Sequence, residues 1–377
     1  MGLAIIFQLP FNLYQSGLMG LQRQVLLSVI LIVFSTVRGV GSVLTLWFVS
    51  PTIEAYFSWQ IIVNICAVFF VGNALRSSLP VTKIKPRFRK RLLVDARSFA
   101  AGWTGNAFLN VVLGQVDKII LSKFLNLEGF AYYTLAQTVA GSLWAIIGSV
   151  TSAAFPKFAT LVAQSDLVRL RALYRESSQA MAVLLIPTAV VLIVFAADIM
   201  SMWTRDESIA EHTRHVLGLL TCGVMFGGVA SVPVYLQLAY NWFGLTIRTN
   251  IAMLFLSVPL IGFLCTYFGV VGAASGAAIV SAGMVVTVPF MHSKVLVGEF
   301  AHWAKYALVV PACVGASIVV AAKVLMPATS SIGLQASYVL GAWIVAVSMT
   351  AAVLPDFRPK LLAAVFQWWR QVRTRGT

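Results

Sequence analysis

Charged side chains are scarce in this sequence of 377 residues. Asp, Glu, Lys and Arg together make up 10% of the residues, whereas hydrophobic residues make up 59%. An ordinary soluble domain has about 25% charged and about 45–50% apolar residues. The mean hydropathy is also high, at +0.89. This composition excludes a typical soluble globular fold and predicts a polytopic membrane protein.

Cysteine is equally rare, and its positions carry no redox signal. The chain has four cysteines. All four lie inside apolar runs, where a lone thiol behaves as a small hydrophobic side chain; they are Cys66, Cys222, Cys265 and Cys313. We therefore expect neither a disulfide framework nor a cysteine-based metal site.

Long apolar segments recur along the whole chain at the length of a membrane span. A bilayer core takes about 20 residues of helix. Strands of a membrane barrel would be half as long and would alternate polar with apolar residues, which these segments do not. The sequence thus predicts an all-α helix bundle with about 11 transmembrane helices: 2–20, 25–49, 53–72, 98–122, 129–155, 178–201, 215–240, 245–267, 269–292, 303–327 and 333–355.

Lys and Arg are unevenly distributed among the connections between these segments. Of the 27 Lys and Arg residues, 21 fall in one alternating set of connections and ends, five fall in the opposite set, and Arg38 lies within a segment. The positive-inside rule assigns the richer set to the cytoplasm. This predicts that residues 73–97, residues 156–177 and the C-terminus are cytoplasmic, and that residues 323–333 lie outside.

The net charge of +15 would suggest nucleic acid as a partner of a soluble protein. Here the basic stretches 83–97 and 357–375 flank apolar segments. Such stretches set topology and contact anionic headgroups. Trp368 and Trp369 beside Arg370 further predict an amphipathic tail helix in the membrane interface. We therefore expect membrane lipids, and no nucleic acid, as partners.

Signatures of enzymes and metal sites are missing. The sequence has no phosphate-binding glycine-rich loop followed by Lys and no nucleophile elbow. His212 and His215 lie near Glu211, but "EHTRH" differs from the zinc-binding HExxH arrangement. The outer connections reach only about a dozen residues, too few for an outer catalytic domain. We predict no catalytic residues, no metal site and no enzymatic activity.

Proline and glycine occur within the predicted spans in a way that is typical of transporters. Proline in a membrane helix permits a kink where neighbouring helices accommodate it, and small residues four apart allow close helix approach. The stretches 9–23 and 232–248 also resemble each other and lie six segments apart, which predicts two parallel lobes. Our hinge and packing candidates are Pro10, Pro187, Pro233, Pro259, Gly272 and Gly276.

Three motifs together resemble a known family. They are "GQVDKIILSKFLNLEGFAYYTLAQTVAG" (114–141), "AAFPKFATL" (153–161) and "YFGVVGAASGAAIVSAG" (267–283). This set is similar to the Wzx-type polysaccharide or O-antigen flippases, in the superfamily of the lipid II flippase MurJ and the multidrug MATE exporters. The matching positions of the first motif are Gln115, Asp117 and Lys118, then Gly129, Tyr132, Tyr133 and Ala136.

The resemblance implies a two-lobed transporter of the bacterial cytoplasmic membrane. Such a protein flips a polyprenyl-diphosphate-linked oligosaccharide for O-antigen, capsule or exopolysaccharide synthesis, needs no soluble cofactor, and acts beside a polymerase and other polysaccharide-assembly proteins. One alternative is a polymerase or ligase of the same pathway, although the large outer loop expected of those enzymes is missing. A MATE-like multidrug exporter is the other alternative, and acidic residues in the cavity would favour it.

The resemblance also implies a division of the chain. We expect an incomplete N-lobe at 1–90 with three helices and a basic loop, a six-helix C-lobe at 91–292, and two additional helices with a basic tail at 293–377. Because the family has six helices in each lobe, the first three helices of the N-lobe are expected to be absent from this sequence.

Four polar residues within or near the spans are candidates for a substrate cavity. Arg38 is the only basic residue near the middle of a span, and Asp117 is the only acid clearly within one. A buried Arg can bind a diphosphate through paired hydrogen bonds, so we expect Arg38 to contact the lipid carrier and Asp117 to hold Arg38 when the cavity is empty. Gln115 and Lys118 complete the set, and Lys118 can extend its amine towards the headgroups.

Overall fold

The computed structural model describes residues 8–79, 90–326 and 331–358. Within these ranges every regular element is a helix, as the sequence predicts. The contacts divide the chain after Lys90 into two compact units, which are described one at a time. Three segments lie outside the described ranges: the first seven residues, residues 80–89 with part of the basic stretch, and the predicted tail helix around Trp368.

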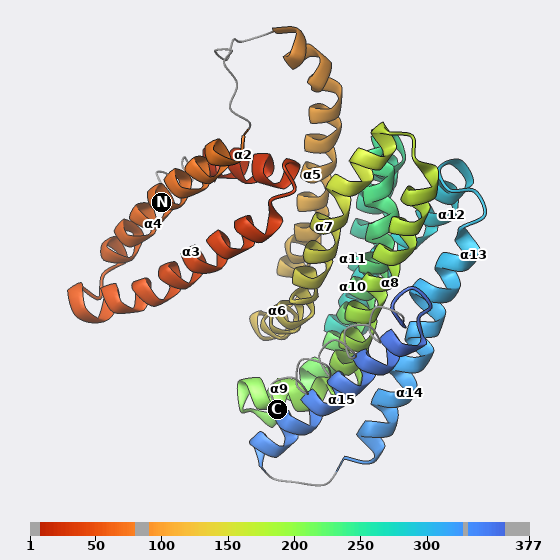
Figure 1. Cartoon of the computed structure of the whole chain (residues 1–377). Coiled ribbons are helices and arrows are strands. Elements are labelled where there is room, and N and C mark those ends of the chain that lie inside the picture. Colours follow the sequence, from red (N-terminus) through yellow and green to blue (C-terminus); the bar gives the residue numbers. More distant parts are fainter. Residues whose placement is uncertain (1–7, 80–89, 327–330, 359–377) are drawn as a thin grey trace, which may run out of the picture. The chain divides into compact units, whose positions relative to one another are not determined.

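Over its described residues, 8–79, the first unit contains three α-helices, which Figure 1 shows. They are α2 (Gln8–Gly20), α3 (Gln24–Leu44), continued by the π-helical turn η1 (Thr45–Val49), and α4 (Ile53–Ser78). α4 begins where the Thr52 hydroxyl accepts a hydrogen bond from the Ala55 amide, an N-cap that satisfies one free amide of the first turn. Leu18, Leu27 and Val71 form the small buried core.

The second unit carries the remaining helices. Their bounds are α5 (Lys90–Phe124), α6 (Leu127–Gly141), α7 (Leu143–Ala163), α8 (Leu167–Val194), α9 (Ala196–Thr204), α10 (Glu207–Ala239), α11 (Phe243–Ala282), η2 (Gly283–Val286), α12 (Thr287–Lys294), α13 (Phe300–Trp303), η3 (Ala304–Val309), α14 (Val310–Val324) and α15 (Ile332–Val353). Asn126, Asp166 and Asp206 accept hydrogen bonds from first-turn amides, which starts α6, α8 and α10 at these points.

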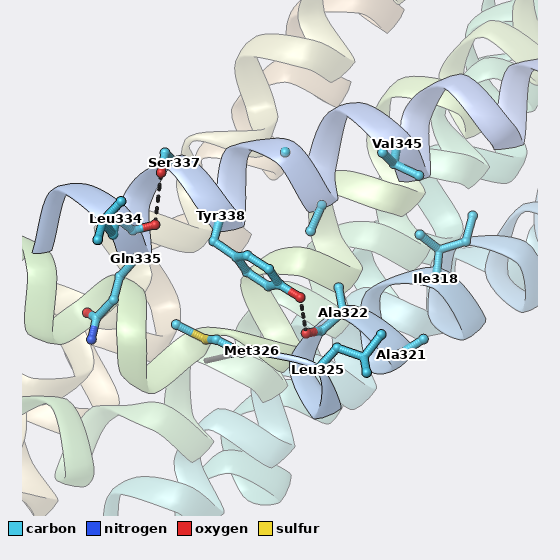
Figure 2. Close-up of a pocket in the computed structure, with 12 residues that line it drawn as sticks. Ile318, Ala321, Ala322, Leu325, Met326, Leu334, Gln335, Ser337, Tyr338 and Val345 are labelled. Carbon is cyan, nitrogen blue, oxygen red and sulfur yellow. Dashed lines mark hydrogen bonds between the residues drawn. The ribbon is translucent and has the colours of Figure 1, made fainter. Parts of the chain in front are cut away.

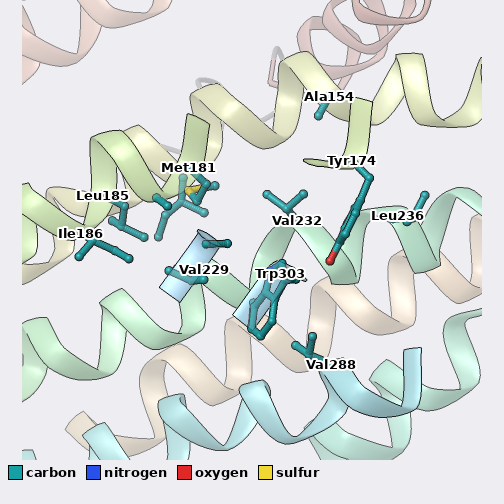
Figure 3. Packing of buried hydrophobic residues seen from close by; sticks show 14 of the residues in the cluster. Ala154, Tyr174, Met181, Leu185, Ile186, Val229, Val232, Leu236, Val288 and Trp303 are labelled. Atoms are coloured by element: carbon teal, nitrogen blue, oxygen red, sulfur yellow. The ribbon is translucent and has the colours of Figure 1, made fainter. Parts of the chain in front are cut away.

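α10 lies at the centre of the second unit and contacts α6, α7, α8, α9 and α11. Figure 3 shows the main core, where Met181 and Leu185 of α8 meet Val229 and Val232 of α10 and the Trp303 ring. α14 and α15 pack against α8 through a separate cluster that includes Val191 and Val319. The two additional helices therefore share a core with α8 and form one unit with α5–α11.

α11 contains a reversal at Gly269. This residue has φ 58° and ψ −138°, a combination that glycine adopts without the steric penalty of a side chain. Beyond it, Gly272 returns against the Leu264 carbonyl and Gly276 returns against Ile261. α11 is therefore an antiparallel helical hairpin, with a first arm at 243–268 and a second arm from 270 onward. Its first arm covers the predicted span 245–267, and its second arm covers the predicted span 269–292 together with η2 and α12.

Eight described helices or helix pairs are long and apolar enough to cross a membrane, compared with the 11 predicted segments. One of the eight, Phe243–Lys294, includes both arms of the α11 hairpin. α2 is described over only 13 residues. α5 is long enough, but polar residues such as Asn106, Asn110 and Asp117 lower its hydropathy. The chain is a multi-pass helical membrane protein, and its least apolar long helix carries the candidate site.

Candidate functional site

Asp117 of α5 is bound by three hydrogen-bond donors. The Tyr133 hydroxyl donates to Oδ2 at 2.7 Å, and the Gln137 amide donates to the same oxygen at 2.8 Å. The backbone amide of Lys118 donates to Oδ1 at 2.8 Å. Asp117 is 7% exposed and forms no ion pair among the described residues. The site therefore holds a carboxylate solely through neutral donors.

The local sequence explains how these groups meet. α5 ends at Phe124 and the Asn126 cap starts α6 two residues later, so the two helices form a tight hairpin. Tyr133 and Gln137 are four residues apart and lie on one face of α6. Tyr133 is completely buried, which leaves its hydroxyl dependent on an acceptor inside the protein.

A cavity of about 180 Å³ adjoins this carboxylate. α5 and α6 contribute Asp117 and Gln137, and α11 contributes Ser257 and Ser281. The rest of its wall is mainly apolar, with small residues such as Ala140. A small cavity with a few polar groups in its wall can hold water or a small polar or cationic group.

Gln115 and Lys118 do not line this cavity. Gln115 is exposed and Lys118 is half-buried, so their side chains leave the helix on other faces. Lys118 contributes to the site only through its backbone amide.

Arg38 lies in the first unit, midway along α3. Its Nη2 donates to Oδ1 of Asn64 on α4 at 2.8 Å, and its Nε is buried without a partner among the described residues. Next to it, the Gln60 amide donates to the Ser42 hydroxyl at 3.1 Å. Among the described residues, the guanidinium thus contacts a neutral amide and no carboxylate.

Glu54 is the only acidic residue in 1–90. It lies in the first turn of α4, about 15 Å along the helix from Asn64 at 1.5 Å per residue. Arg38 and Asp117 belong to different units, and each has partners within its own unit. The expected pairing of Arg38 with Asp117 stays a prediction.

The proline and glycine candidates have different surroundings. Pro187, Pro233 and Pro259 lie inside α8, α10 and α11, respectively, whereas Pro10 is near the described start of α2. Gly272 and Gly276 hold the two arms of the α11 hairpin together. The structure places these glycines at close helix contacts, and the hinge role of the prolines stays a prediction.

An apolar groove of about 700 Å³ lies between α14 and α15 (Figure 2). Its wall is nearly all apolar, with residues such as Ile318, Leu325 and Val345, and it includes no charged side chain. The Tyr338 hydroxyl in this groove already donates to the Ala322 carbonyl at 2.8 Å. The groove offers no cation to an anionic headgroup.

Sequence reasoning missed a polar cluster near the start of α8. Arg175 donates two hydrogen bonds, of 2.8 and 2.7 Å, to the Glu299 carboxylate, and Arg171 lies 3.2 Å from the same group. One turn further along, the Gln179 amide donates to Asp356 at 2.7 Å. The spacing 171, 175, 179 marks one helix face, but nothing in the sequence pairs it with acids more than a hundred residues away.

Part of this chain resembles known proteins in sequence. Residues 33–204 match the polysaccharide biosynthesis protein family, a range that includes both Arg38 and Asp117. The "Putative O-antigen transporter" of Shigella flexneri is 20% identical over 243 residues, which cover 64% of this chain and 56% of that protein. The chain therefore spans little more than half the length of this relative.

Two solved transporter structures share the fold. A mutant of the Vibrio cholerae MATE transporter VcmN is 14% identical with a TM-score of 0.67, covering 78% of this chain and 67% of that one. The lipid II flippase MurJ, in an inward closed conformation, is 13% identical with a TM-score of 0.57, covering 87% of this chain and 67% of that one. This chain has the MATE/MurJ-like transporter fold. The resemblance predicted from the three motifs is confirmed at the level of family match and fold.

Proposed function

We propose that this protein flips a polyprenyl-diphosphate-linked oligosaccharide across the bacterial cytoplasmic membrane for surface polysaccharide synthesis. The family match, the O-antigen transporter relative and the flippase-like fold support this. We also propose that its C-terminus is cytoplasmic and that it hands its product to a polymerase of the same pathway.

The proposal rests mainly on the surroundings of Arg38, whose charge has a neutral amide as its hydrogen-bond partner. A charged residue at the centre of a span costs about 2.5–3.5 kcal/mol on insertion scales, and Asn64 provides Arg38 with no compensating charge. A diphosphate supplies that charge and accepts several hydrogen bonds from a guanidinium. Gln60 and Asn64 on the same face add neutral polar groups for the remaining oxygens.

In this proposal the lipid diphosphate replaces Asn64 as the hydrogen-bond acceptor of Arg38 during transport. Asp117 would have to release Tyr133 or Gln137 to bind Arg38 between cycles. The fold also permits a drug exporter, and the Asp117 cavity favours that second candidate because a buried carboxylate attracts cations. Asp117 is one acid in a small cavity, which makes the lipid diphosphate the better-supported substrate.

A vesicle assay tests this function. The purified full-length protein is reconstituted in liposomes with a fluorescent polyprenyl-diphosphate sugar, and flipping is followed by quenching from one side. We expect transport by the wild type, loss of at least tenfold in Arg38→Ala, and partial retention in Arg38→Lys, which keeps the charge but not the paired hydrogen bonds.

Arg76→Ala is the matched control, because Arg76 is exposed in the last turn of α4 and should not contribute. Equal flipping by Arg38→Ala and the wild type would refute the role of Arg38. Export of cationic dyes without flipping of the lipid would support the second candidate instead.

A further inference from the structure

A second groove, of about 620 Å³, lies between the end of α5 and the first arm of α11. Its walls are apolar and include Ile119, Ile120, Val258 and Pro259. Gly262 widens it, since this position has no side chain and only the Phe124 ring lies within 4 Å of where its Cβ would be. From Val116 to Lys123 the groove follows α5 for about 10 Å at 1.5 Å per residue.

The polar groups of this groove are gathered at one end. Lys123 and Thr266 lie there, each near the end of its helix arm. The Lys123 side chain is exposed and forms no ion pair with any described acid. The apolar walls and the single cation thus occupy separate parts of one groove.

The surroundings place this end at the membrane interface. Tyr267 and Phe268 follow Thr266 at the tip of the α11 hairpin and are 71% and 66% exposed. Aromatic residues of this kind gather at the headgroup level, and a Lys near a span end extends its amine to the same level. The apolar part of the groove then faces acyl chains, and Lys123 faces phosphates.

We propose that this groove binds one anionic phospholipid of the bilayer, with an acyl chain between α5 and the first arm of α11 and the phosphate on Lys123. The described lining of the groove between α14 and α15 is also apolar and includes no charged side chain. Lys323 in the last turn of α14 is already paired with Asp198, so charge complementarity distinguishes the two grooves. A length of about 10 Å suits part of one acyl chain better than a long polyprenyl tail. This lipid is separate from the transported substrate.

Native mass spectrometry of the purified full chain tests this site. Phosphatidylglycerol and phosphatidylcholine are titrated separately, and the bound lipid is counted. We expect wild-type protein to bind phosphatidylglycerol about fivefold more tightly, the effect of one Lys at an anionic surface. Lys123→Gln should abolish this preference, whereas Lys157→Gln, at an exposed position of α7 outside the groove, should keep it.

A variant that fills the groove provides a second test of the proposal. Gly262→Leu should reduce binding of both lipids at this site at least fivefold, because the side chain occupies the acyl position. Gly244→Leu is its control, since nothing lies within 4 Å of that Cβ position on the same helix. The proposal is overturned if Lys123→Gln keeps the preference, if Gly262→Leu binds like wild type, or if polyprenyl phosphate displaces phosphatidylglycerol at equal concentration.

Discussion

The Asp117 carboxylate is buried on α5 and accepts hydrogen bonds from three neutral donors. Hydrogen bonds to charged groups contribute about 1.5–3 kcal/mol in soluble proteins, and side-chain bonds in membrane bundles contribute less, about 0.6–1.7 kcal/mol. The Tyr133 bond therefore stabilises the α5–α6 hairpin measurably.

A double-mutant cycle tests this bond. Tyr133→Phe keeps the buried ring and removes one donor, so we expect it to lower the free energy of unfolding by about 1–2 kcal/mol. In the Asp117→Asn background the same change should cost less, because the acceptor is no longer charged. Unfolding in bicelles measures all four proteins. Strict additivity of the two changes would show that the residues do not interact.

Glu299 lies in the connection between α12 and α13, outside the spans, and is 4% exposed. The hydrogen bonds from Arg175 lower the pKa of its carboxyl below the ordinary 4.5, with Arg171 and His302 adding to this and burial opposing it. A depressed folded-state pKa contributes stability that is present above the unfolded pKa. That stability is lost as the pH falls below about 4.5 through the folded pKa.

Glu299→Gln should therefore reduce stability at pH 7 and flatten its decline as the pH falls below about 4.5. Thermal unfolding of the wild type and the variant across this range checks the expectation. Glu211→Gln is the matched control, because its partner Arg214 is exposed and Glu211 itself is 61% exposed, so that pair contributes little. A parallel decline in wild type and Glu299→Gln would assign the acid sensitivity to other groups.

At the scale of elements, the α11 hairpin depends on the absence of a side chain at Gly272. A Cβ there would overlap the Leu264 carbonyl oxygen, which cannot rotate away. We expect Gly272→Ala to separate the arms and to cost about 2–3 kcal/mol, in the range of overpacking. Gly244→Ala, with open space around it, should instead gain up to about 1 kcal/mol from helix propensity. Chemical unfolding in detergent compares the two, and equal stabilities would contradict the steric explanation.

At the scale of the whole molecule, charged pairs lie near both ends of the long helix α8. α8 separates Arg175, near its start, from Asp198, just beyond its end. Asp198 accepts from Lys323 of α14 at 2.6 Å, so these two residues mark the end of the bundle opposite the Glu299 cluster. The uneven distribution of Lys and Arg predicts that the Glu299 end is cytoplasmic.

Reporter fusions test this orientation. A phosphatase that is active only outside the cytoplasm should be inactive when fused after Arg97 and active when fused after Ser331. A fluorescent protein that folds in the cytoplasm should give the reverse pattern. The same result at both sites would exclude the proposed topology.

The sequence by itself determined the approximate positions of most described helices, because hydropathy, capping residues such as Asn126 and turn residues such as Gly269 act locally. It did not determine the number of spans, since eight described candidates compare with the 11 predicted segments. Asp117 and Arg38 were also recognisable, since a charge in an apolar run is conspicuous. Only the tertiary structure decided their partners, which are Tyr133 and Gln137 for Asp117, and Asn64 for Arg38. In a lipid-embedded bundle most helices are apolar on every side, so the sequence carries little signal for which face packs inward, and pairs such as Arg175 with Glu299 are brought together by folding alone.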